Sequence, residues 1–178
     1  MILGREPELA VAELASVIER DGLACHIIEV SPVWALVEGE VSADLFQTLG
    51  GSIKFAQVVG ESEFTADALV ALLTEQLVAR PNPRVEFGIS WHGDSRYPRW
   101  FMGVGLKVKR EVKVQAHVRY VVSRDPALSS VVVAKNHLLP PAGFEFIIVP
   151  HEGKLLISRT LGVQDFEAWG KRDFGRPG

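Results

Sequence analysis

This sequence of 178 residues lacks several features that define protein classes. Cys25 is its only cysteine, so no disulfide can form within the chain, and the reducing cytoplasm is the expected location. No apolar run is long enough to cross a bilayer. The first residues have neither the basic start nor the long apolar stretch of a signal peptide. We therefore expect no membrane partner.

The apolar content is nevertheless sufficient for a packed core, since hydrophobic residues make up 47% of the chain and charged residues 23%. This length suits one domain or two small ones. The net charge of −3 conceals an asymmetry along the chain. Residues 1–60 hold nine Asp and Glu against three Lys and Arg, whereas residues 61–178 hold thirteen against sixteen. The first part is acidic and the second is basic.

The first 60 residues predict the element order βαββαβ. A short apolar start precedes a helix from Pro7 to about Asp21, whose apolar residues recur near a period of 3.6. Gly22 is expected to end this helix. The remaining elements are predicted at residues 25–30, 33–37, 43–49 and 52–59. This order is typical of a ferredoxin-like unit.

The residues from 61 to 163 predict a second unit that also mixes helices and strands. Thr65 can cap a helix that ends before Pro81, and a further helix is expected from Pro98 to about Val114. Strands are predicted at residues 85–91, 118–123, 144–149 and 154–158. The fold class is therefore predicted as α+β, with separate sheets in the two units.

Residues 96–135 form the best candidate for contact with a polyanion, because they hold nine Lys and Arg against only Glu111 and Asp125. Tyr97, Trp100 and Tyr120 are interspersed among these cations and could stack on unpaired bases, although Trp100 taken alone is better explained as a core residue. The segment predicts an RNA-binding surface. The alternative is an ordinary solvated face.

Other motifs give no support for chemistry in this chain. Gly103-Val104-Gly105 is too short for a dinucleotide fingerprint, and His92-Gly93-Asp94 offers too few ligands for zinc. Cys25 is expected to be a buried small hydrophobe. Ser129-Ser130 lacks the elbow of a hydrolase, so a phosphate-binding or structural role fits it better. We predict no catalytic residue, no metal site and no cofactor in this chain.

Three segments resemble the tRNA guanine-N2 methyltransferases that carry a THUMP domain. The stretch from Asp125 to Asn136 looks like the late motif of the THUMP domain. Arg159 to Phe166 resembles the exit strand and connector of that family. The opening, Gly4 to Leu9 followed by Ala12-Glu13-Leu14, is similar to the family's amino-terminal ferredoxin-like region. Together with the intervening residues, these segments cover nearly the whole chain.

The resemblance implies an N-terminal ferredoxin-like domain at residues 1–60, a THUMP RNA-binding domain at 61–163, and a linker at 164–178 to an absent methyltransferase domain. Enzymes of the family bear a Gly-rich cofactor loop and an Asn/Asp-Pro-Pro-Tyr-like segment, and neither occurs here. The expected S-adenosylmethionine site and the chemistry would thus belong to a catalytic domain in cis or in trans.

The implied function is a tRNA-binding module that grips the acceptor 3′ end. The alternative is a stand-alone protein-interaction or regulatory module that does not bind RNA, with the acidic first unit as its docking face. The predicted RNA-binding residues are Arg96, Arg99, Lys107, Lys109, Arg110, Lys113, Arg119, Arg124, Ser129, Ser130, Lys135 and Asn136.

Overall fold

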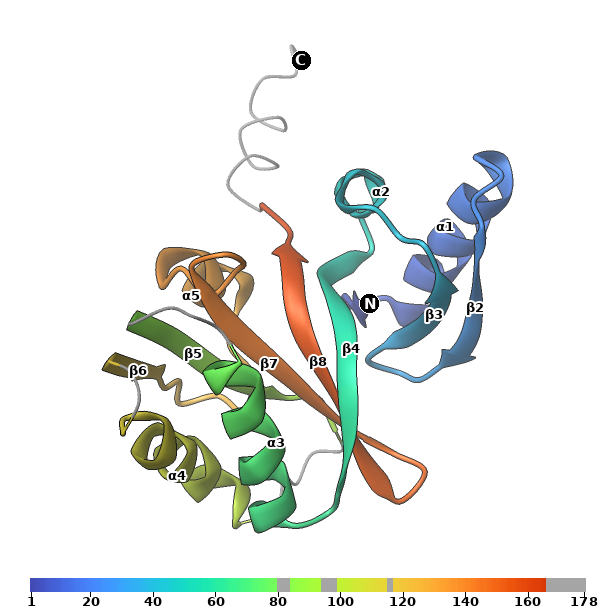
Figure 1. Ribbon diagram of the computed structural model, residues 1–178. Coiled ribbons are helices and arrows are strands. Elements are labelled where there is room, and N and C mark those ends of the chain that lie inside the picture. Colours follow the sequence, from blue (N-terminus) through green and yellow to red (C-terminus); the bar gives the residue numbers. More distant parts are fainter. Residues whose placement is uncertain (80–83, 94–98, 115–116, 166–178) are drawn as a thin grey trace. The chain divides into compact units, whose positions relative to one another are not determined.

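The computed structural model describes residues 1–79, 84–93, 99–114 and 117–165 (Figure 1). The fold is mixed α+β, as predicted. The chain divides into two compact units, residues 1–55 with 162–178, and residues 56–161. No helix in the described part of the chain is both long and apolar enough to span a bilayer.

The first unit has the predicted element order. β1 pairs antiparallel with β4, and Ile2 forms an antiparallel bridge to Trp34, just before β3. β3 in turn pairs antiparallel with β2. The neighbour order β4-β1-β3-β2 is that of a ferredoxin-like unit. Its elements are β1 (Ile2–Leu3), α1 (Pro7–Arg20), β2 (Cys25–Val30), β3 (Ala35–Gly39), α2 (Ala43–Thr48) and β4 (Ser52–Glu63).

Local sequence explains where the helices of the first unit begin and end. Pro7 occupies the first turn of α1, and Gly22 follows the helix with a φ of 59° that suits glycine. Ser42 caps α2, since its hydroxyl oxygen accepts a hydrogen bond from the Leu45 amide at 3.0 Å. Cys25 is buried, as predicted.

The second unit contains the end of β4 and the remaining elements. Its strands follow the order β4-β8-β7-β5-β6, in which β5 lies parallel to both β6 and β7, and β8 is antiparallel to β7. The elements are α3 (Ala66–Val78), β5 (Arg84–Trp91), α4 (Phe101–Val112), β6 (His117–Val121), α5 (Ser130–Lys135), β7 (Gly143–His151) and β8 (Lys154–Val163).

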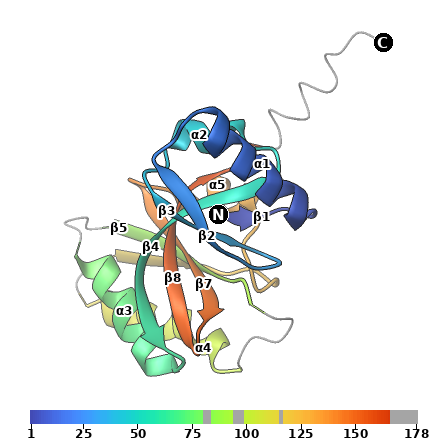
Figure 2. The same ribbon diagram turned by 90° about the vertical axis from the view of Figure 1, so that its right-hand side faces the viewer.

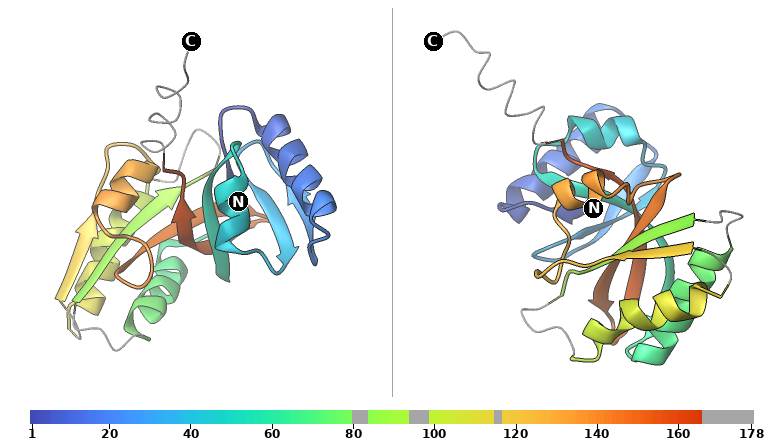
Figure 3. Two further views of the ribbon diagram at one scale, coloured as in Figure 1. Left: turned by 90° about the horizontal axis from the view of Figure 1, so that it is seen from above. Right: turned by 90° about the vertical axis from the view of Figure 1, so that its left-hand side faces the viewer.

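The two faces of β5 are covered by different helices. Phe87 and Ile89 point into a core that the apolar residues of α3 and α4 complete. These two helices pack side by side (Figure 2). Gly88 faces the opposite way, where an added Cβ would meet Leu128 and Leu138 at 2.3 and 2.9 Å. The segment that contains α5 therefore covers the other face of the sheet, which the right-hand view in Figure 3 shows.

The expectation of two separate sheets is wrong. Hydrogen bonding links the strands in the order β1-β4-β8-β7-β5-β6, because β4 is 12 residues long and continues past its predicted end at residue 59 to Glu63. In the sequence, Glu61-Ser62-Glu63 looks like a polar boundary between the two units. In the structure these residues are the end of β4, where strand pairing satisfies their backbone groups. Polar side chains can alternate with other residues along an extended strand. The predicted limit at residue 60 thus falls inside a strand.

Candidate nucleic-acid interface

The described members of the predicted RNA-binding set come from three parts of the second unit, and Arg96 lies outside the described residues. The three groups are Lys107, Lys109, Arg110 and Lys113 on or just after α4, Arg119, Lys135 and Asn136 on β6 and near the end of α5, and Arg99, Arg124, Ser129 and Ser130 in or beside the connections that follow β5 and β6.

The first group occupies the outer side of α4. Val104 and Val108 face the core, whereas Lys107, Arg110 and Lys113 are exposed and Lys109 is half-buried. Lys107 differs from the others because its Nζ pairs with Asp67 Oδ1 on α3 at 3.1 Å. Within the described residues, it is the one cation of this group that pairs with a carboxylate. Lys109, Arg110 and Lys113 are therefore the α4 cations best placed to contact phosphates.

Arg119 and Asn136 of the second group belong to a hydrogen-bond network around a buried carboxylate, on the face of the sheet that α5 covers. Arg119 donates from Nη1 to Glu86 at 3.2 Å and from Nη2 to the Asn136 side-chain oxygen at 2.8 Å. Arg84 donates to the other Glu86 oxygen at 3.2 Å. Glu86 thereby holds two guanidinium groups and offsets part of their charge. Sequence reasoning missed both Arg84 and Glu86, because the pairing of β5 with β6 cannot be read from either strand alone.

The third group lies at the carboxyl ends of β5 and β6. The Trp91 amide donates to the Pro126 carbonyl at 2.9 Å, and the Leu128 amide donates to Ser90 Oγ at 2.9 Å. These bonds attach the segment after β6 to the end of β5. Ser129 accepts a hydrogen bond from the Val132 amide at 3.3 Å and so caps α5, which gives it a structural role.

A buried polar cluster supports this end of the sheet. Glu145 on β7 is fully buried and accepts hydrogen bonds from Ser90 Oγ at 2.5 Å and from Thr160 Oγ1 at 2.6 Å. The cluster joins β5, β7 and β8. Because Ser90 also accepts from the Leu128 amide, the carboxylate positions the connection after β6 indirectly. No sequence pattern marks these three residues as neighbours.

Tyr120 does not offer the free stacking face that the sequence suggested. Its ring stacks on Phe87 with centroids 4.9 Å apart, and an added Cβ on Gly105 would meet it at 2.0 Å. Burial raises the pKa of the Tyr120 phenol, in keeping with its place between α4 and β6. It is a core contact between α4 and β6. Tyr97 lies outside the described residues.

Four aromatic side chains meet near the end of β5. The Phe64 ring approaches Trp91 and Trp100 edge to face, with centroid distances of 6.1 and 5.8 Å. Trp91 contacts Phe101 at 5.1 Å. Phe101 is buried and Trp100, expected in the core, is half-buried, whereas Phe64 remains 38% exposed. Sequence reasoning missed Phe64 and Trp91, because they come from different elements.

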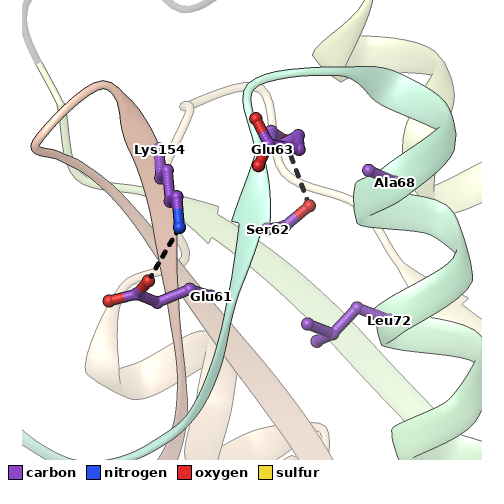
Figure 4. A pocket seen from close by; sticks show the side chains of 6 residues that line it. All are labelled: Glu61, Ser62, Glu63, Ala68, Leu72 and Lys154. Atoms are coloured by element: carbon purple, nitrogen blue, oxygen red, sulfur yellow. Dashed lines mark hydrogen bonds and ion pairs between the residues drawn. The ribbon is translucent and has the colours of Figure 1, made fainter.

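A shallow pocket lies beside the start of α3 (Figure 4). It encloses about 240 Å³, and its polar rim carries Glu61, Glu63 and Lys154. Lys154 Nζ pairs with Glu61 at 3.6 Å, so its charge is already offset. A phosphate would face an excess of carboxylates here. Among the described residues, no three His, Cys, Asp or Glu side chains are grouped closely enough to hold a metal ion.

No protein-family model and no curated protein matches this sequence. Among solved structures, the chain is similar to TrmN from Thermus thermophilus, with a TM-score of 0.51 and 10% sequence identity over 92% of this chain and 44% of that one. The chain shares the fold of that part of TrmN. PH1313 from Pyrococcus horikoshii Ot3 is also similar, with a TM-score of 0.47 and 11% identity over 89% of this chain and 48% of that one. The chain thus spans less than half the length of either protein.

Within the first unit of this TrmN-like fold, Gln164 holds the last described residues of the chain. Its backbone amide donates to the Ile53 carbonyl at 3.1 Å. Its side-chain amide donates to the carbonyl groups of Phe46 and Leu49, at the end of α2. Gln164 is buried, although the sequence places it at the start of a linker. The rest of the predicted linker, from residue 166, lies outside the described residues.

Proposed function

We propose that this chain is the tRNA-binding module of a tRNA-modifying methyltransferase. It grips the acceptor 3′ end and positions the tRNA for an S-adenosylmethionine-dependent catalytic domain, which acts in cis or in trans. The observation that carries the proposal is the fold, which is similar to that of TrmN over 92% of the chain and suits a tRNA-related module of the THUMP type. The sequence resemblance to THUMP enzymes supports it independently, and the assignment to guanine N2 rests on that resemblance alone.

The cations of α4 supply the physical basis for RNA contact. Arg110 and Lys113 are exposed and Lys109 is half-buried, at the end of a helix whose other side is anchored in the core. Cations in this position neutralise phosphates and release counterions, so binding depends on salt and little on base sequence. Recognition then depends on the shape of the tRNA and on its unpaired end.

Binding of tRNA to charge variants tests the proposal. We expect Lys109→Glu/Lys113→Glu to weaken binding to every tRNA similarly, by about tenfold or more, because two phosphate contacts become repulsive. The slope of log K against log salt should fall by about 2, or about 1 for each lost contact. Arg5→Glu is the control, since Arg5 is exposed in the first unit, and it reverses one charge where the test variant reverses two. Fluorescence anisotropy at several salt concentrations measures both quantities.

If the unmodified chain binds tRNA at low salt no better than it binds a neutral polymer, the proposal is wrong. The protein-interaction alternative then gains support, with the acidic first unit as the docking face. If Arg5→Glu lowers the free energy of binding by about half as much as the double variant does, the effect reflects net charge and is not specific to α4.

A further inference from the structure

The solvent side of α4 has an apolar half and a basic half. Met102 is 68% exposed and Leu106 is 52% exposed, one turn further along the helix. Three cations follow them at the end of the helix. At about 100° per residue, these five side chains lie within about 100° of one another around the helix axis. The α4 stripe therefore consists of Met102, Leu106, Lys109, Arg110 and Lys113.

Contact with phosphates accounts for the basic half of the α4 stripe only. A single exposed apolar side chain is ordinary, but Met102 and Leu106 are neighbours on one side of the helix and form a continuous patch. Covering this patch is favourable only when the partner also removes apolar surface from water. The occupant that fits the whole stripe has apolar side chains beside carboxylates.

The exposed side of α1 has both features. Leu9 is 69% exposed, and small residues continue from it along the same side of the helix. Glu8 and Glu19 are exposed at the two ends of this side. At about 100° per residue, its members lie within about 120° of one another around the axis. The α1 stripe consists of Glu8, Leu9, Ala12, Ala15, Ser16 and Glu19.

The two stripes have opposite charge. The α4 stripe carries +3 from its three cations, and the α1 stripe carries −2 from Glu8 and Glu19. Charges at the ends of α1 do not alter this value, because they are balanced as Arg5 with Glu6 and as Arg20 with Asp21, the latter two forming an ion pair at 2.7 Å. Complementary charges on two surfaces favour their association and disfavour contact between like surfaces.

The stripes also match in size and length. The small side chains in the middle of the α1 stripe allow large side chains of another helix to approach closely. Eleven positions separate Glu8 from Glu19 and also Met102 from Lys113, so each stripe is about 17 Å long at about 1.5 Å per residue. Because each end of the α1 stripe carries a glutamate, the α4 cations meet a carboxylate whichever way the two helices run.

We infer that the α4 stripe of one copy of this chain binds the α1 stripe of a second copy. The contact joins two different surfaces, so it is heterologous and produces a ring or an open chain of copies. It goes beyond the proposed function and places self-association in competition with tRNA for Arg110 and Lys113. Two short helix faces bury less area than the about 1,600 Å² of a stable interface, so the association is weak and transient.

Sedimentation equilibrium without RNA tests this inference. At low salt, where exposed charges are little screened, the average mass of the unmodified chain should rise as its concentration approaches about 0.1 mM. Glu8→Lys/Glu19→Lys and Arg110→Glu/Lys113→Glu should each weaken self-association by about tenfold or more, because like charges then meet. All four side chains are exposed, so both variants are expected to fold. An equimolar mixture of the two should associate again, since their altered stripes are complementary.

Two further variants separate this contact from an effect of net charge. Met102→Gln/Leu106→Gln leaves the charge unchanged and should also weaken association by about tenfold, because the apolar patch is lost. Glu40→Lys/Glu75→Lys is the matched control for the α1 variant. It reverses two exposed carboxylates outside both stripes and should associate as the unmodified chain does.

The inference is overturned if the unmodified chain remains monomeric up to this concentration, or if the stripe variants associate as strongly as it does. Equal loss of association in the Glu40→Lys/Glu75→Lys control would overturn it as well, and so would failure of the mixture to restore association. The measurement contains no RNA, so its outcome is independent of the proposed function.

Discussion

Glu13 connects two parts of the first unit that are distant in sequence. Its carboxylate oxygens accept hydrogen bonds from the amides of Gly50 and Gly51, each at 2.8 Å. Gly51 also lies close to α1, where an added Cβ would meet Ala10 at 2.6 Å. A carboxylate in the middle of a helix thereby positions the turn that leads into β4.

Replacement of Glu13 by alanine should lower the free energy of unfolding by about 1–3 kcal/mol, because two amides lose charge-assisted hydrogen bonds. Glu19→Ala on the same helix is the matched control. Glu19 is exposed, and its substitution should change stability by less than about 0.5 kcal/mol. Urea unfolding of both variants measures the difference. Equal effects would show that the turn does not depend on Glu13.

The amino group of Met1 should make stability depend on pH. Burial lowers its pKa from 8.0 to about 6, and the group donates a hydrogen bond to the Ala35 carbonyl at 2.8 Å. Between these two pKa values the unfolded chain binds more protons than the folded chain, so stability rises as pH increases from about 6 to 8. The gain is up to about 3 kcal/mol, since one pKa unit corresponds to about 1.4 kcal/mol.

Urea unfolding of the chain with a free amino terminus, repeated at several values between pH 5.5 and 8.5, measures this dependence. The same chain with an acetylated terminus provides the control, because acetylation removes the titrating group. A rise of the same size in the acetylated chain would assign the pH dependence to other residues.

At the scale of elements, two glycines of α4 differ in the space that surrounds them. Gly105 packs against β6, and an added Cβ would meet the Tyr120 ring at 2.0 Å. Gly103 has no such neighbour within 4 Å. Alanine has the higher helix propensity at both positions, by about 1 kcal/mol. The space between the helix and its neighbours therefore decides whether alanine stabilises or destabilises the chain at each position.

We expect Gly105→Ala to destabilise the chain by about 1–3 kcal/mol, because overpacking outweighs the gain in propensity. Gly103→Ala should stabilise it by up to about 1 kcal/mol. Thermal or urea unfolding of the pair checks the prediction. A stabilising Gly105→Ala would mean that α4 lies farther from Tyr120 than described.

At the scale of the whole molecule, the proposal assigns tRNA binding to this chain and catalysis to another domain, which leads to a prediction about the cofactor. Methyl transfer requires the donor and the acceptor nitrogen to be held at near-contact distance by one enzyme. The sequence of this chain lacks a Gly-rich cofactor loop of the kind found in THUMP methyltransferases. We expect isothermal titration of the chain with S-adenosylmethionine to give no binding heat. Thermal unfolding with S-adenosylmethionine present should show no shift of the midpoint. Saturable binding would assign part of the chemistry to this chain.

The positions of most elements follow from the sequence, because periodicity and capping are local. Thr65 caps α3 through a hydrogen bond from the Ala68 amide at 3.4 Å, and α4 lies within the predicted range of 98–114. Pro7 and Gly22 mark α1 for reasons that involve only their own backbones. The α+β class follows from the order of these elements.

The arrangement of the candidate site depends on tertiary structure. Cations of α4 and β6 that belong to one segment of the sequence separate in the structure, because α4 and α5 cover opposite faces of the sheet. Asp67 and Glu86 come from outside that segment and offset two of the cations. Phe64 joins Trp100 only after β4 and β5 have entered one sheet. A charge or an aromatic ring can be counted along a chain, but its neighbours depend on strand pairing between distant residues, which no local pattern specifies.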